Sequence, residues 1–492
     1  MKDTPLYTVA QVRAFDRAAI ELHGIDGYVL MQRAAAAAFV CLQARWPHAR
    51  SVAVVCGSGN NGGDGYVLAR LARAARLDVQ LISLEPPRGG EAARARADWI
   101  DAGGVVLGVD APLPDADVHV DAIFGTGLTR APEGAALHWI EALNGSARPL
   151  LALDVPSGLD ADTGTVPGAA VRAAATASFV AHKRGLFTGA AADHCGVVTL
   201  DDLEVPAEVF AAAKADARLL DIGAIRTWLP ARDNNVHKGT FGHVLAIGGD
   251  SGMGGAIRLA GEAALRVGAG LVSVATRSAH VVALNAARPE LMASAVEGPQ
   301  ELEAMLDAAS VVALGPGLGQ RAWGHALWYA ALAAGKPTVL DADALNLLAR
   351  DGPALPAQCV LTPHPGEAGR LLDCDTQRIA ADRFAAVRAM ARRFNAVVVL
   401  KGSGTLIAAP DGDVAVCPWG NPGMASGGMG DVLTGVIAGL LAQGLDAWHA
   451  AQAGVALHAL AGDAAARRGQ AGTLASDLFE PLRLLRNGLP SA

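Results

Sequence analysis

The hydrophobic pattern of the chain predicts helices and strands in alternation. The first helical region covers residues 8–45, and an alanine-rich helix follows from Leu30 within it. Apolar residues repeat there at three- and four-residue steps, at Val12, Phe15, Ala19 and Leu22. This is the spacing of one face of a helix. The β-branched run Ser51–Cys56 is instead typical of a strand, and it leads through a glycine-rich loop into another helix.

Further apolar runs also end in loops of small and polar residues. These runs are 118–124 and 150–153 in the first half, and 243–247, 311–314, 360–361 and 397–400 in the second. Strands that alternate with helices imply a parallel sheet covered on both faces. An Asp411-Gly412 turn between two apolar runs predicts a hairpin. The fold class is therefore α/β.

The chain is too long for one ordinary core. It has 492 residues, and its periodicity weakens between about 201 and 235, where prolines and an Asp-Asn-Asn run interrupt it. We place a linker at 215–222. Two domains are predicted, one covering residues 1–215 and the other residues 222–492.

Composition excludes several classes of protein. The net charge is −8, there is no basic tract, and Tyr occurs four times, which argues against a nucleic-acid partner. No apolar run reaches the length of a membrane span, and the N-terminus lacks a signal-peptide core. The six cysteines are scattered without a Cys-x-x-Cys pair, so we expect buried thiols and a cytoplasmic protein.

One glycine-rich stretch, residues 420–435, precedes the apolar helix-length run Val432–Leu441. Such a loop presents free backbone N–H groups and the positive end of a helix dipole, which together favour an anion such as phosphate. Asp431 stands within this stretch. A carboxylate there would repel a phosphate unless it accepts a proton from an attacking hydroxyl. The alternative is that Asp431 caps the helix.

Polar residues also follow the strands of the first half. If the strands are parallel, Asn61, Asp121, Asp154 and Ser157 would lie at one edge of the sheet. Their oxygens would suit a cation, while Asp154 moves a proton. Two alternatives remain open at this point. One is that these residues are caps and turn residues. The other is an NAD-dependent oxidoreductase, which the G-x-G-x-x-G spacing of Gly57, Gly59 and Gly62 permits.

The loops of the first half resemble those of the NAD(P)H-hydrate epimerase domain. The matching stretches are Gly59–Gly65, Asp121 with Gly125–Leu128, and Asp154–Gly158, within residues 1 to about 215. The resemblance implies a Rossmann-like three-layer α/β/α domain that interconverts the R and S hydrates of NADH and NADPH. It also implies potassium near Asn61, Asp121 and Ser157, with Asp154 as the acid–base residue. Substrate-binding positions implied by it are Asn60, Asn61, Gly62, Gly63, Asp64, Gly125, Thr126, Gly127, Leu128, Thr129, Arg130 and Asp154. The segment Gln32–Ala35 departs from the family's usual Glu-Asn-Ala-Gly.

The second half resembles the NAD(P)H-hydrate dehydratase domain of the ribokinase-like superfamily. Its matching stretches are His237–Gly239 with Gly248-Gly249, Gly315–Gly319, Thr362–Glu367, Lys401-Gly402 and Gly428–Asp431. Together the two halves look like a bifunctional NAD(P)H-hydrate repair enzyme. The second domain is then expected to be a ribokinase-like α/β/α domain that dehydrates the S hydrate with ADP, giving AMP and phosphate.

This second resemblance also implies roles for individual residues. Asp431 would be the catalytic base and would contact the substrate. The other hydrate-side positions are Ala256, Gly317, Gly319 and His364, and the nucleotide-side positions are Lys401, Gly402, Ser403, Gly404, Thr405 and Gly430. The residues themselves agree in part, because His364 lies between two prolines and is held rigid, and Lys401 follows a strand where it can meet a phosphate. ADP as co-substrate, K⁺ in the first domain and Mg²⁺ in the second are the expected ligands, with NADHX and NADPHX as substrates. We expect a homo-oligomer.

Two other functional classes remain possible from the sequence. A small-molecule kinase of the same superfamily would consume ATP and release a stable phosphorylated product. A binding or scaffold protein would not need Asp64, Asp121, Asp154 and Asp431, all of which are present. The sequence leaves open the oligomeric state, the choice between NADHX and NADPHX, and the choice between ADP and ATP.

Overall fold

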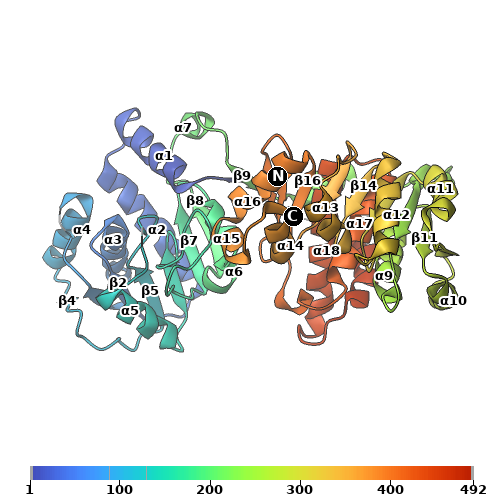
Figure 1. Ribbon diagram of the computed structural model, residues 1–492. Helices are drawn as coiled ribbons and strands as arrows, with labels where there is room; N and C mark the ends of the chain where they lie inside the picture. Colours follow the sequence, from blue (N-terminus) through green and yellow to red (C-terminus); the bar gives the residue numbers. More distant parts are fainter. Residues whose placement is uncertain (1–3, 88, 129, 489–492) are drawn as a thin grey trace. The chain divides into compact units, whose positions relative to one another are not determined.

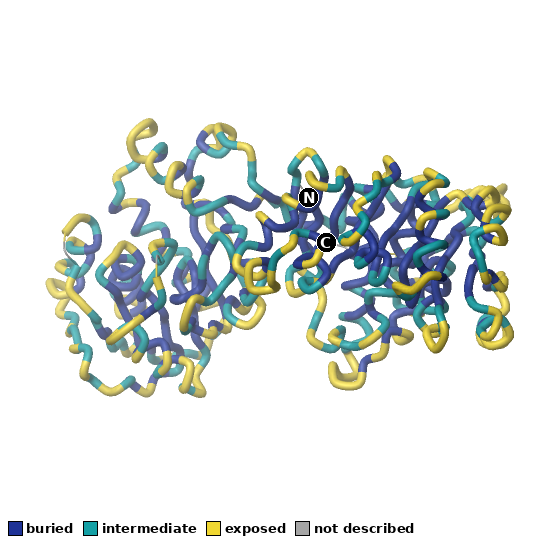
Figure 2. Tube along the Cα trace, viewed as in Figure 1, coloured by how far each residue is buried: buried dark blue, intermediate teal, exposed yellow. Residues whose placement is uncertain are grey.

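The computed structural model describes residues 4–87, 89–128 and 130–488 (Figure 1). Contacts divide the chain into two compact units, one from Pro5 to Ala217 and the other from Arg218 onward. Each unit has its own buried strands, drawn in dark blue in Figure 2. The two units are therefore described one at a time.

The first unit is built on a seven-stranded sheet in the order β4-β3-β2-β5-β6-β7-β8, in which all the strand pairs are parallel. Its strands are β2 (Ser51–Cys56), β3 (Asp78–Ser83), β4 (Val106–Leu107), β5 (Val118–Ala122), β6 (Leu150–Leu153), β7 (Ala175–Phe179) and β8 (Val197–Asp201), and β1 (Pro5–Leu6) precedes them. Its helices are α1 (Val9–Glu21), α2 (Gly27–Arg45), α3 (Asn60–Ala74), α4 (Gly90–Asp101), α5 (Gly134–Gly145), α6 (Ala191–His194) and α7 (Ala207–Ala211), with the 3₁₀ turn η1 (Arg184–Phe187).

Successive residues of the central strand β2 belong to different hydrophobic clusters. Val54 packs in the cluster that includes residues of α1 to α4, whereas Val55 packs with Trp139 and Ile140 of α5. Neighbouring side chains of a strand point to opposite faces of the sheet. Both faces are therefore covered, which gives the three-layer α/β/α arrangement expected from the sequence.

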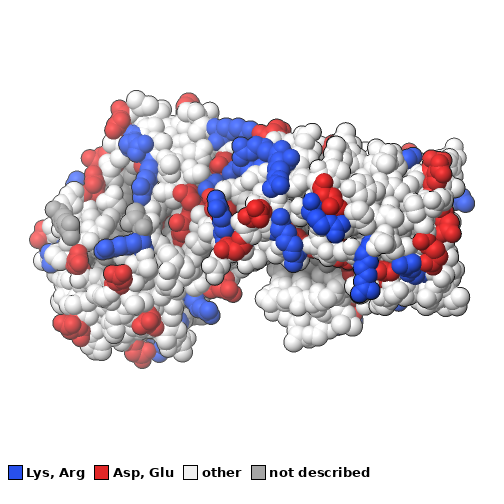
Figure 3. Space-filling view, in the orientation of Figure 1, with Lys and Arg blue, Asp and Glu red and all other residues white. Residues whose placement is uncertain are grey.

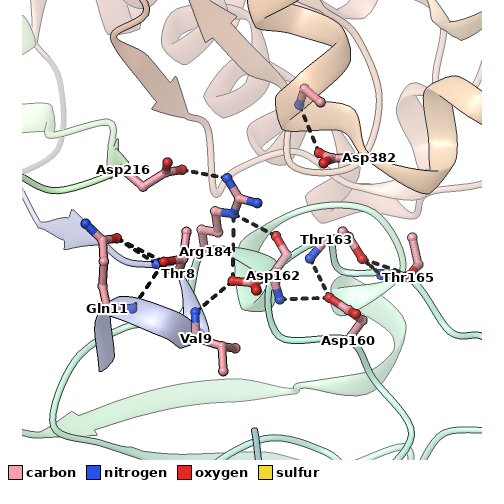
Figure 4. Close-up of polar contacts among 11 residues, drawn as sticks. Thr8, Val9, Gln11, Asp160, Asp162, Thr163, Thr165, Arg184, Asp216 and Asp382 are labelled. Atoms are coloured by element: carbon pink, nitrogen blue, oxygen red, sulfur yellow. Dashed lines mark hydrogen bonds and ion pairs between the residues drawn. The ribbon is translucent and has the colours of Figure 1, made fainter. Parts of the chain in front are cut away.

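Hydrogen bonds around Arg184 hold the start of α1 against the loop that contains residues 160–165 (Figure 4). Arg184 donates to a carboxylate oxygen of Asp216 at 2.7 Å and to the carbonyl oxygen of Asp162 at 3.0 Å. The Asp162 carboxylate accepts the Val9 N–H at 2.8 Å. Thr8 caps α1, and the side chain of Gln11 reciprocates. These contacts fix α1 and the segment that begins at Lys183, both of which line the cavity described below.

The second unit contains a longer mixed sheet in which the strands follow the order β9-β18-β17-β16-β15-β14-β13-β10-β11-β12. Its strands are β9 (Ala217–Leu219), β10 (His243–Ile247), β11 (Leu271–Thr276), β12 (Met292–Ala295), β13 (Val311–Leu314), β14 (Thr338–Leu340), β15 (Cys359–Leu361), β16 (Val397–Leu400), β17 (Leu406–Ala408) and β18 (Val414–Val416). The neighbouring strands β12, β11, β10, β13, β14, β15 and β16 pair in parallel. The pairs β16-β17 and β17-β18 are antiparallel. The hairpin predicted at Asp411-Gly412 is therefore confirmed.

Helices pack along this sheet in the pattern typical of α/β folds. They are α8 (Ile222–Trp228), α9 (Gly254–Arg266), α10 (Ser278–Ala287), α11 (Pro299–Ala308), α12 (Ala322–Ala333), α13 (Asp343–Asp351), α14 (Pro365–Leu372), α15 (Thr376–Ala381), α16 (Arg383–Phe394), α17 (Met429–Ala442), α18 (Ala447–Ala465) and α19 (Phe479–Asn487). Short 3₁₀ turns are η2 (Lys238–Phe241), η3 (Pro422–Met424), η4 (Ala466–Arg468) and η5 (Ala475–Leu478). The main core cluster joins α9, α17 and α18 to the strands.

The segment expected to be a linker is structured. Between residues 215 and 222 lies β9, which pairs in parallel with β18 through Arg218 with Ala415 and Leu219 with Val416. The helix α8 begins at Ile222, capped by the Asp221 carboxylate at 2.8 Å from the Gly223 nitrogen. The strand is only three residues long, which is too short to produce a periodic pattern in the sequence.

Helices α9 and α17 pack unusually close together through glycines. A Cβ atom at Gly435 would lie 1.9 Å from the carbonyl oxygen of Ala260, and one at Gly439 would lie 2.7 Å from a methyl group of Val267. Both glycines belong to α17, a helix whose residues from Val432 to Leu441 are all buried. The absence of side chains at these two positions sets the distance between the helices.

The surface carries charged side chains of both signs. Acidic and basic side chains are interspersed on the face shown in Figure 3. Within the described part of the chain, no helix combines the length and the apolar character needed to cross a bilayer. Five of the cysteines are buried and Cys374 is partly exposed, and all six are free thiols.

We predict that Gly435→Ala destabilises the second unit by about 1–3 kcal/mol or more, because the new methyl group must displace backbone. The matched control is Gly255→Ala on α9, where an added Cβ meets nothing within 4 Å. That change should be neutral or stabilising by about 0.5–1 kcal/mol. Thermal unfolding of the full chain measures both. Equal melting temperatures for the two variants would contradict the packing argument.

Candidate active sites

A cavity of about 570 Å³ opens in the first unit beside the carboxyl ends of β2, β5 and β6. Ligands bind at this end of the strands in open parallel sheets. Of the residues predicted from the sequence, those lining the cavity are Asn60, Asn61, Asp64, Gly125, Thr126, Gly127 and Asp154. Leu128 and Arg130 fall beyond its lining, and Thr129 lies outside the described residues.

The loop expected between β2 and α3 is partly helical. The helix begins at Asn60, with Gly59 as an N-cap that makes no side-chain hydrogen bond, so Asn60 to Asp64 form its first turns. Glycine is required at position 62, because a Cβ there would lie 2.0 Å from the carbonyl oxygen of Gly57. Sequence pattern alone missed this start because glycine and asparagine are weak helix formers.

Asp121 and Ser157 form a buried pair at the end of β5. The Ser157 hydroxyl donates to the Asp121 carboxylate at 2.6 Å, and the Ser157 N–H donates to its other oxygen at 2.8 Å. The Phe124 N–H donates to the Ser157 hydroxyl at 2.8 Å. Burial raises the pKa of Asp121 to about 6, although these hydrogen bonds oppose the rise.

The side chain of Asn61 points into the same region. A Cβ at Gly125 would lie 3.4 Å from the Asn61 amide carbon and 3.2 Å from an Asp154 carboxylate oxygen, so these three residues are neighbours. Both polar atoms of the Asn61 amide are buried, and neither has a hydrogen-bond partner within the described structure. A buried, unpartnered amide oxygen is available as a ligand for a cation.

Asp154 is held in place by its backbone and by Lys183. Its φ angle is +63°, in the left-handed region that Asp tolerates better than most residues. Its carboxylate forms an ion pair with the buried Lys183 ammonium. The same ammonium donates to the Ser178 hydroxyl at 3.1 Å and to the Phe179 carbonyl at 2.7 Å. All three donors of the lysine are therefore used, and the carboxylate is fixed.

Two further side chains of the cavity come from α1, which the sequence did not mark as functional. Asp16 and Arg13 line the cavity, and Arg13 donates to the Thr126 carbonyl at 2.9 Å. Burial raises the pKa of Asp16 to about 6, with Asp154 contributing and Lys183 opposing. Burial raises the pKa of Asp64 well above its usual value, and the charges of Asp154 and Asp16 add to the rise. Asp16, Asp64 and Asp154 thus line the cavity together with the Lys183 ammonium, and Glu91 is a fourth carboxyl group of its lining.

In the second unit, α17 begins at Met429 with Gly428 as its N-cap. Gly428 has a φ of +91° and no side-chain capping bond, so Gly430 and Asp431 already belong to the first helical turn. The alternative that Asp431 caps the helix is therefore wrong. The N–H groups of a first turn have no partner within the helix, and they form the positive end of its dipole.

Lys401 lies beside this turn in a cluster of carboxylates. Its ammonium donates to Asp341 at 2.8 Å and lies 3.8 Å from a Glu367 oxygen. A Cβ at Gly430 would lie 3.2 Å from that ammonium and 3.3 Å from an Asp341 oxygen. The Thr434 hydroxyl, one turn further along α17, donates to Asp341 at 2.9 Å. Asp341 was missed in the sequence because it ends a short strand outside any glycine motif.

These charges give the carboxyl groups different pKa values. Burial raises the pKa of Asp431 to about 7, with the Asp341 charge adding to the rise and Lys401 opposing it. Burial also raises the pKa of Glu367 to about 7. Burial acts on Asp341 in the same direction, but the Lys401 charge and the hydrogen bonds from Lys401, Thr362 and Thr434 outweigh it and lower the pKa. Asp431 can therefore gain or lose a proton near pH 7, while Asp341 stays ionised.

The loop 401–405 is organised by Arg383, a buried residue that no sequence motif indicated. Its guanidinium donates to the carbonyl oxygens of Leu400 at 3.2 Å and Gly404 at 3.4 Å. The Thr405 hydroxyl donates to the Gly402 carbonyl at 2.9 Å. Ser403 lies exposed at the tip of this loop. Of the predicted nucleotide-side residues in this loop, Lys401 brings its ammonium beside Gly430.

Three of the predicted hydrate-side residues, Ala256, Gly317 and Gly319, lie beside the loop after β10. Glycine is required at positions 317 and 319, because an added Cβ would lie 2.7 Å from the Met253 Cβ and 2.8 Å from an Asp250 oxygen respectively. The same hypothetical Cβ at Gly317 would lie 3.4 Å from the Cβ of Ala256. Gly315 starts the loop after β13 that also contains Gly317 and Gly319. A Cβ at Gly315 would lie 1.9 Å from the Asp341 carbonyl oxygen, so this loop adjoins the carboxylate cluster.

His364 has a structural task beyond the one expected. It is the N-cap of α14, where its Nδ1 accepts the Gly366 N–H at 3.0 Å and Glu367 accepts the His364 N–H at 2.8 Å. The backbone just before it is tied to Lys401, whose N–H donates to the Pro363 carbonyl at 2.9 Å. Burial lowers the pKa of His364, with the nearby Lys401 charge as the next cause, and the ring is neutral near pH 7.

We predict that Lys183→Met destabilises the first unit by about 3–5 kcal/mol, because it leaves the partly buried Asp154 carboxylate without its cation. Thermal unfolding of the full chain gives the change. The double variant Lys183→Met with Asp154→Asn removes both charges and should recover much of the loss. If the double variant is destabilised relative to the parent by the sum of the two single effects, the pair makes no coupled contribution.

Comparison with known proteins agrees with the division of the chain. A family model described as NAD(P)H-hydrate dehydratase matches residues 244–483, and one described as YjeF-related protein N-terminus matches residues 27–185. Among solved structures, an ADP/ATP-dependent NAD(P)H-hydrate dehydratase from Bacillus subtilis co-crystallised with ATP and Mg²⁺ has a TM-score of 0.50 and 32% identity, covering 55% of this chain and 97% of its own. A ribokinase-like superfamily protein from Enterococcus faecalis has a TM-score of 0.52 and 30% identity, covering 56% and 97%.

Two curated relatives extend over almost the whole chain. The bifunctional NAD(P)H-hydrate repair enzyme of Coxiella burnetii is 47% identical over 98% of this chain and 100% of its own length. The Escherichia coli enzyme of the same name is 44% identical over 97% of this chain and 93% of its own. Similarity at this level across both units shows that the chain belongs to the family of bifunctional NAD(P)H-hydrate repair enzymes.

Proposed function

We propose that this chain repairs hydrated nicotinamide cofactors by two activities. The first unit interconverts the R and S hydrates of NADH and NADPH, and the second dehydrates the S form with ADP. The observation that carries the proposal is the position of Asp431, a carboxyl group with a pKa of about 7 in the first turn of a glycine-started helix. An anion cradle and a proton acceptor in one turn suit phosphoryl transfer to a hydroxyl.

In the second unit, the hydroxyl on C6 of the damaged ring gives its proton to Asp431 and attacks the β-phosphorus of ADP. AMP leaves as the bond between its oxygen and that phosphorus breaks. The N–H groups at Gly428 to Gly430 stabilise the charge on the transferred phosphoryl group. The ring nitrogen then expels phosphate from C6, and loss of a proton from the neighbouring carbon restores the double bond.

The residues around Asp431 divide between the two ligands. The loop Lys401–Thr405 and Gly430 bind the nucleotide, with Arg383 holding that loop. Ala256, Gly317, Gly319 and His364 bind the hydrate. Lys401 faces two carboxylates, and its charge both keeps Asp341 ionised and meets the phosphates.

Mg²⁺ fits the second site as an ion shared with phosphate oxygens. Among the described residues, no group of three or more His, Cys, Asp or Glu side chains forms a cage for a metal. Mg²⁺ commonly binds through one or two carboxylates together with substrate phosphates, and Asp341 and Glu367 are the carboxylates available here. Its chemistry when bound is to neutralise charge on the phosphates.

In the first unit, Asp154 moves the proton during interconversion of the two hydrates. Lys183 keeps its carboxylate in position. The other substrate contacts are Asn60, Asn61, Gly62, Gly63, Asp64 and the loop that begins at Gly125. Asn61, Asp121 and Ser157 would hold K⁺, and the unpartnered amide oxygen of Asn61 supports this assignment. The ion would add positive charge beside a cluster of carboxyl groups.

The domains of this proposal are residues 1–215 for the epimerase and 222–492 for the dehydratase. A cytoplasmic location and a homo-oligomer remain proposals. The pairing of the two activities has a chemical reason, because a dehydratase that accepts one epimer needs the other converted to it.

We predict reciprocal losses for two variants that keep side-chain size. Asp431→Asn should lower dehydration of the S hydrate by about two to four powers of ten, the usual loss of a general base. Asp154→Asn should abolish conversion of R to S and leave dehydration of S unchanged. The assay incubates purified full-length protein with NADHX of known epimer composition and ADP, and follows nicotinamide absorbance together with chromatography of both epimers.

Each variant is the control for the other, because both carry the same substitution and only one activity should change. Retention of more than about a tenth of the dehydratase rate by Asp431→Asn would exclude its role as base. Stable accumulation of a phosphorylated hydrate would instead identify a kinase.

We further predict how dehydration depends on pH. Asp431 acts as a base only when ionised, so the rate at saturating substrate should fall about tenfold per unit as pH drops below about 7 and level off above it. Lys401→Met removes the charge that holds this pKa down, so its acid limb should shift to higher pH. A rate that is flat from pH 5 to 8 would contradict the assignment.

A further inference from the structure

The second unit contains a cavity that lies away from Asp431. It has a volume of about 610 Å³ and is enclosed by Leu229–Arg232, by the end of α9, by residues near the end of α10, and by α19. Arg486 of this cavity donates to the side chain of Gln443, the C-cap of α17. Asp431 lies in the first turn of the same helix, and α17 has 14 residues, so about 20 Å separates its two ends.

The charge of this cavity is strongly unbalanced. Five arginines line it, against two carboxylates: Arg232, Arg266, Arg288, Arg483 and Arg486, with Glu262 and Glu290. The other lining residues are uncharged. We call these five side chains the arginine cluster. Its positive charges outnumber the carboxylates of the lining by three.

The single buried carboxylate is already committed to arginines. Glu262 accepts Arg288 at 2.5 Å and Arg266 at 3.3 Å, and it lies 3.6 Å from Arg258. Glu290 and Glu480 stand further out, each 3.8 Å from one arginine of the cluster. Arg266 and Arg288 therefore have carboxylate partners. The rest of the arginine cluster has no counter-charge among the described residues.

Among the described residues, Arg232, Arg483 and Arg486 make up that uncompensated part. Arg232 donates to the Gly268 carbonyl and stacks on the Phe241 ring at 3.6 Å, whereas Arg486 donates to the Pro230 carbonyl at 3.4 Å. Arg232 and Arg486 both contact neutral groups. Burial lowers the pKa of Arg486, and repulsion by the Arg232 charge adds to the fall. The Nε of Arg486 is buried with no hydrogen-bond partner in the described structure. Two neighbouring cations held this way are unfavourable unless an anion joins them.

We propose that the arginine cluster is a binding site for a phosphate-bearing small molecule that carries two or more negative charges, such as a nucleotide. Guanidinium groups bind phosphate through paired, charge-assisted hydrogen bonds. The volume lies within the range of small-molecule sites, and it exceeds what one phosphate fills. This site is separate from the anion cradle at Gly428, and the proposal stands whether or not the function proposed above is right.

The test is calorimetric titration of the full-length protein with inorganic pyrophosphate. The double variant Arg232→Gln with Arg486→Gln should lose one bound pyrophosphate per chain, or bind it at least about tenfold more weakly. The matched control is Arg392→Gln, which removes an exposed arginine on α16 and should bind as the parent does. Dehydratase activity without pyrophosphate should be unchanged in both. Equal binding by parent and double variant would overturn the proposal.

Chemical footprinting of the parent protein keeps the test decisive if the double variant fails to fold. Pyrophosphate should protect Arg232, Arg483 and Arg486 from phenylglyoxal by at least about threefold, read by peptide mass spectrometry, and should leave Arg392 unprotected. Absence of protection overturns the proposal. Protection that follows protein concentration and ignores pyrophosphate also overturns it, because the occupant would then be another copy of the chain.

Discussion

The contact between the backbones of α9 and α17 fixes the geometry of the second unit. Because Gly435 and Gly439 have no side chains, the two helices approach so closely that a Cβ atom at either position would clash with its neighbour. One helix carries Asp431 near its start, and the other carries Ala256 near its start. The positions of Asp431, the proposed base, and of Ala256, a proposed hydrate-side residue, therefore depend on a contact in the core, where packing leaves little freedom.

Each unit places a lysine beside an aspartate, with opposite consequences. Lys183 contacts the candidate acid–base residue itself, and Ser178 and Phe179 hold it there. Lys401 instead contacts Asp341, which lies next to Asp431. Burial then dominates at Asp431 and raises its pKa, while the ion pair keeps Asp341 ionised. The same pair of residue types thus fixes one carboxylate and leaves another free to take up a proton.

The strands, the two-unit division and the glycine loops could be predicted from the sequence, because β-branched runs and glycine motifs are local signals. Groups that act across long sequence distances could not. Asp341 reaches Lys401 over 60 positions, and Asp16 comes from a helix whose pattern indicates only packing. Arg383 reads as an ordinary surface residue until the fold buries it under the loop 401–405. The helix starts at Asn60 and Met429 could not be predicted, because both lie in glycine-rich stretches and glycine is a weak helix former.

Asp154 carries two requirements at once. Its carboxylate must meet Lys183, and its backbone must hold a φ of +63°. Glycine satisfies the backbone without the carboxylate, and glutamate supplies a carboxylate on a longer side chain at a backbone cost of about 1–2 kcal/mol. Few single substitutions lead away from this residue without loss. During evolution, therefore, the turn after β6 could acquire new chemistry only if backbone and side chain changed together.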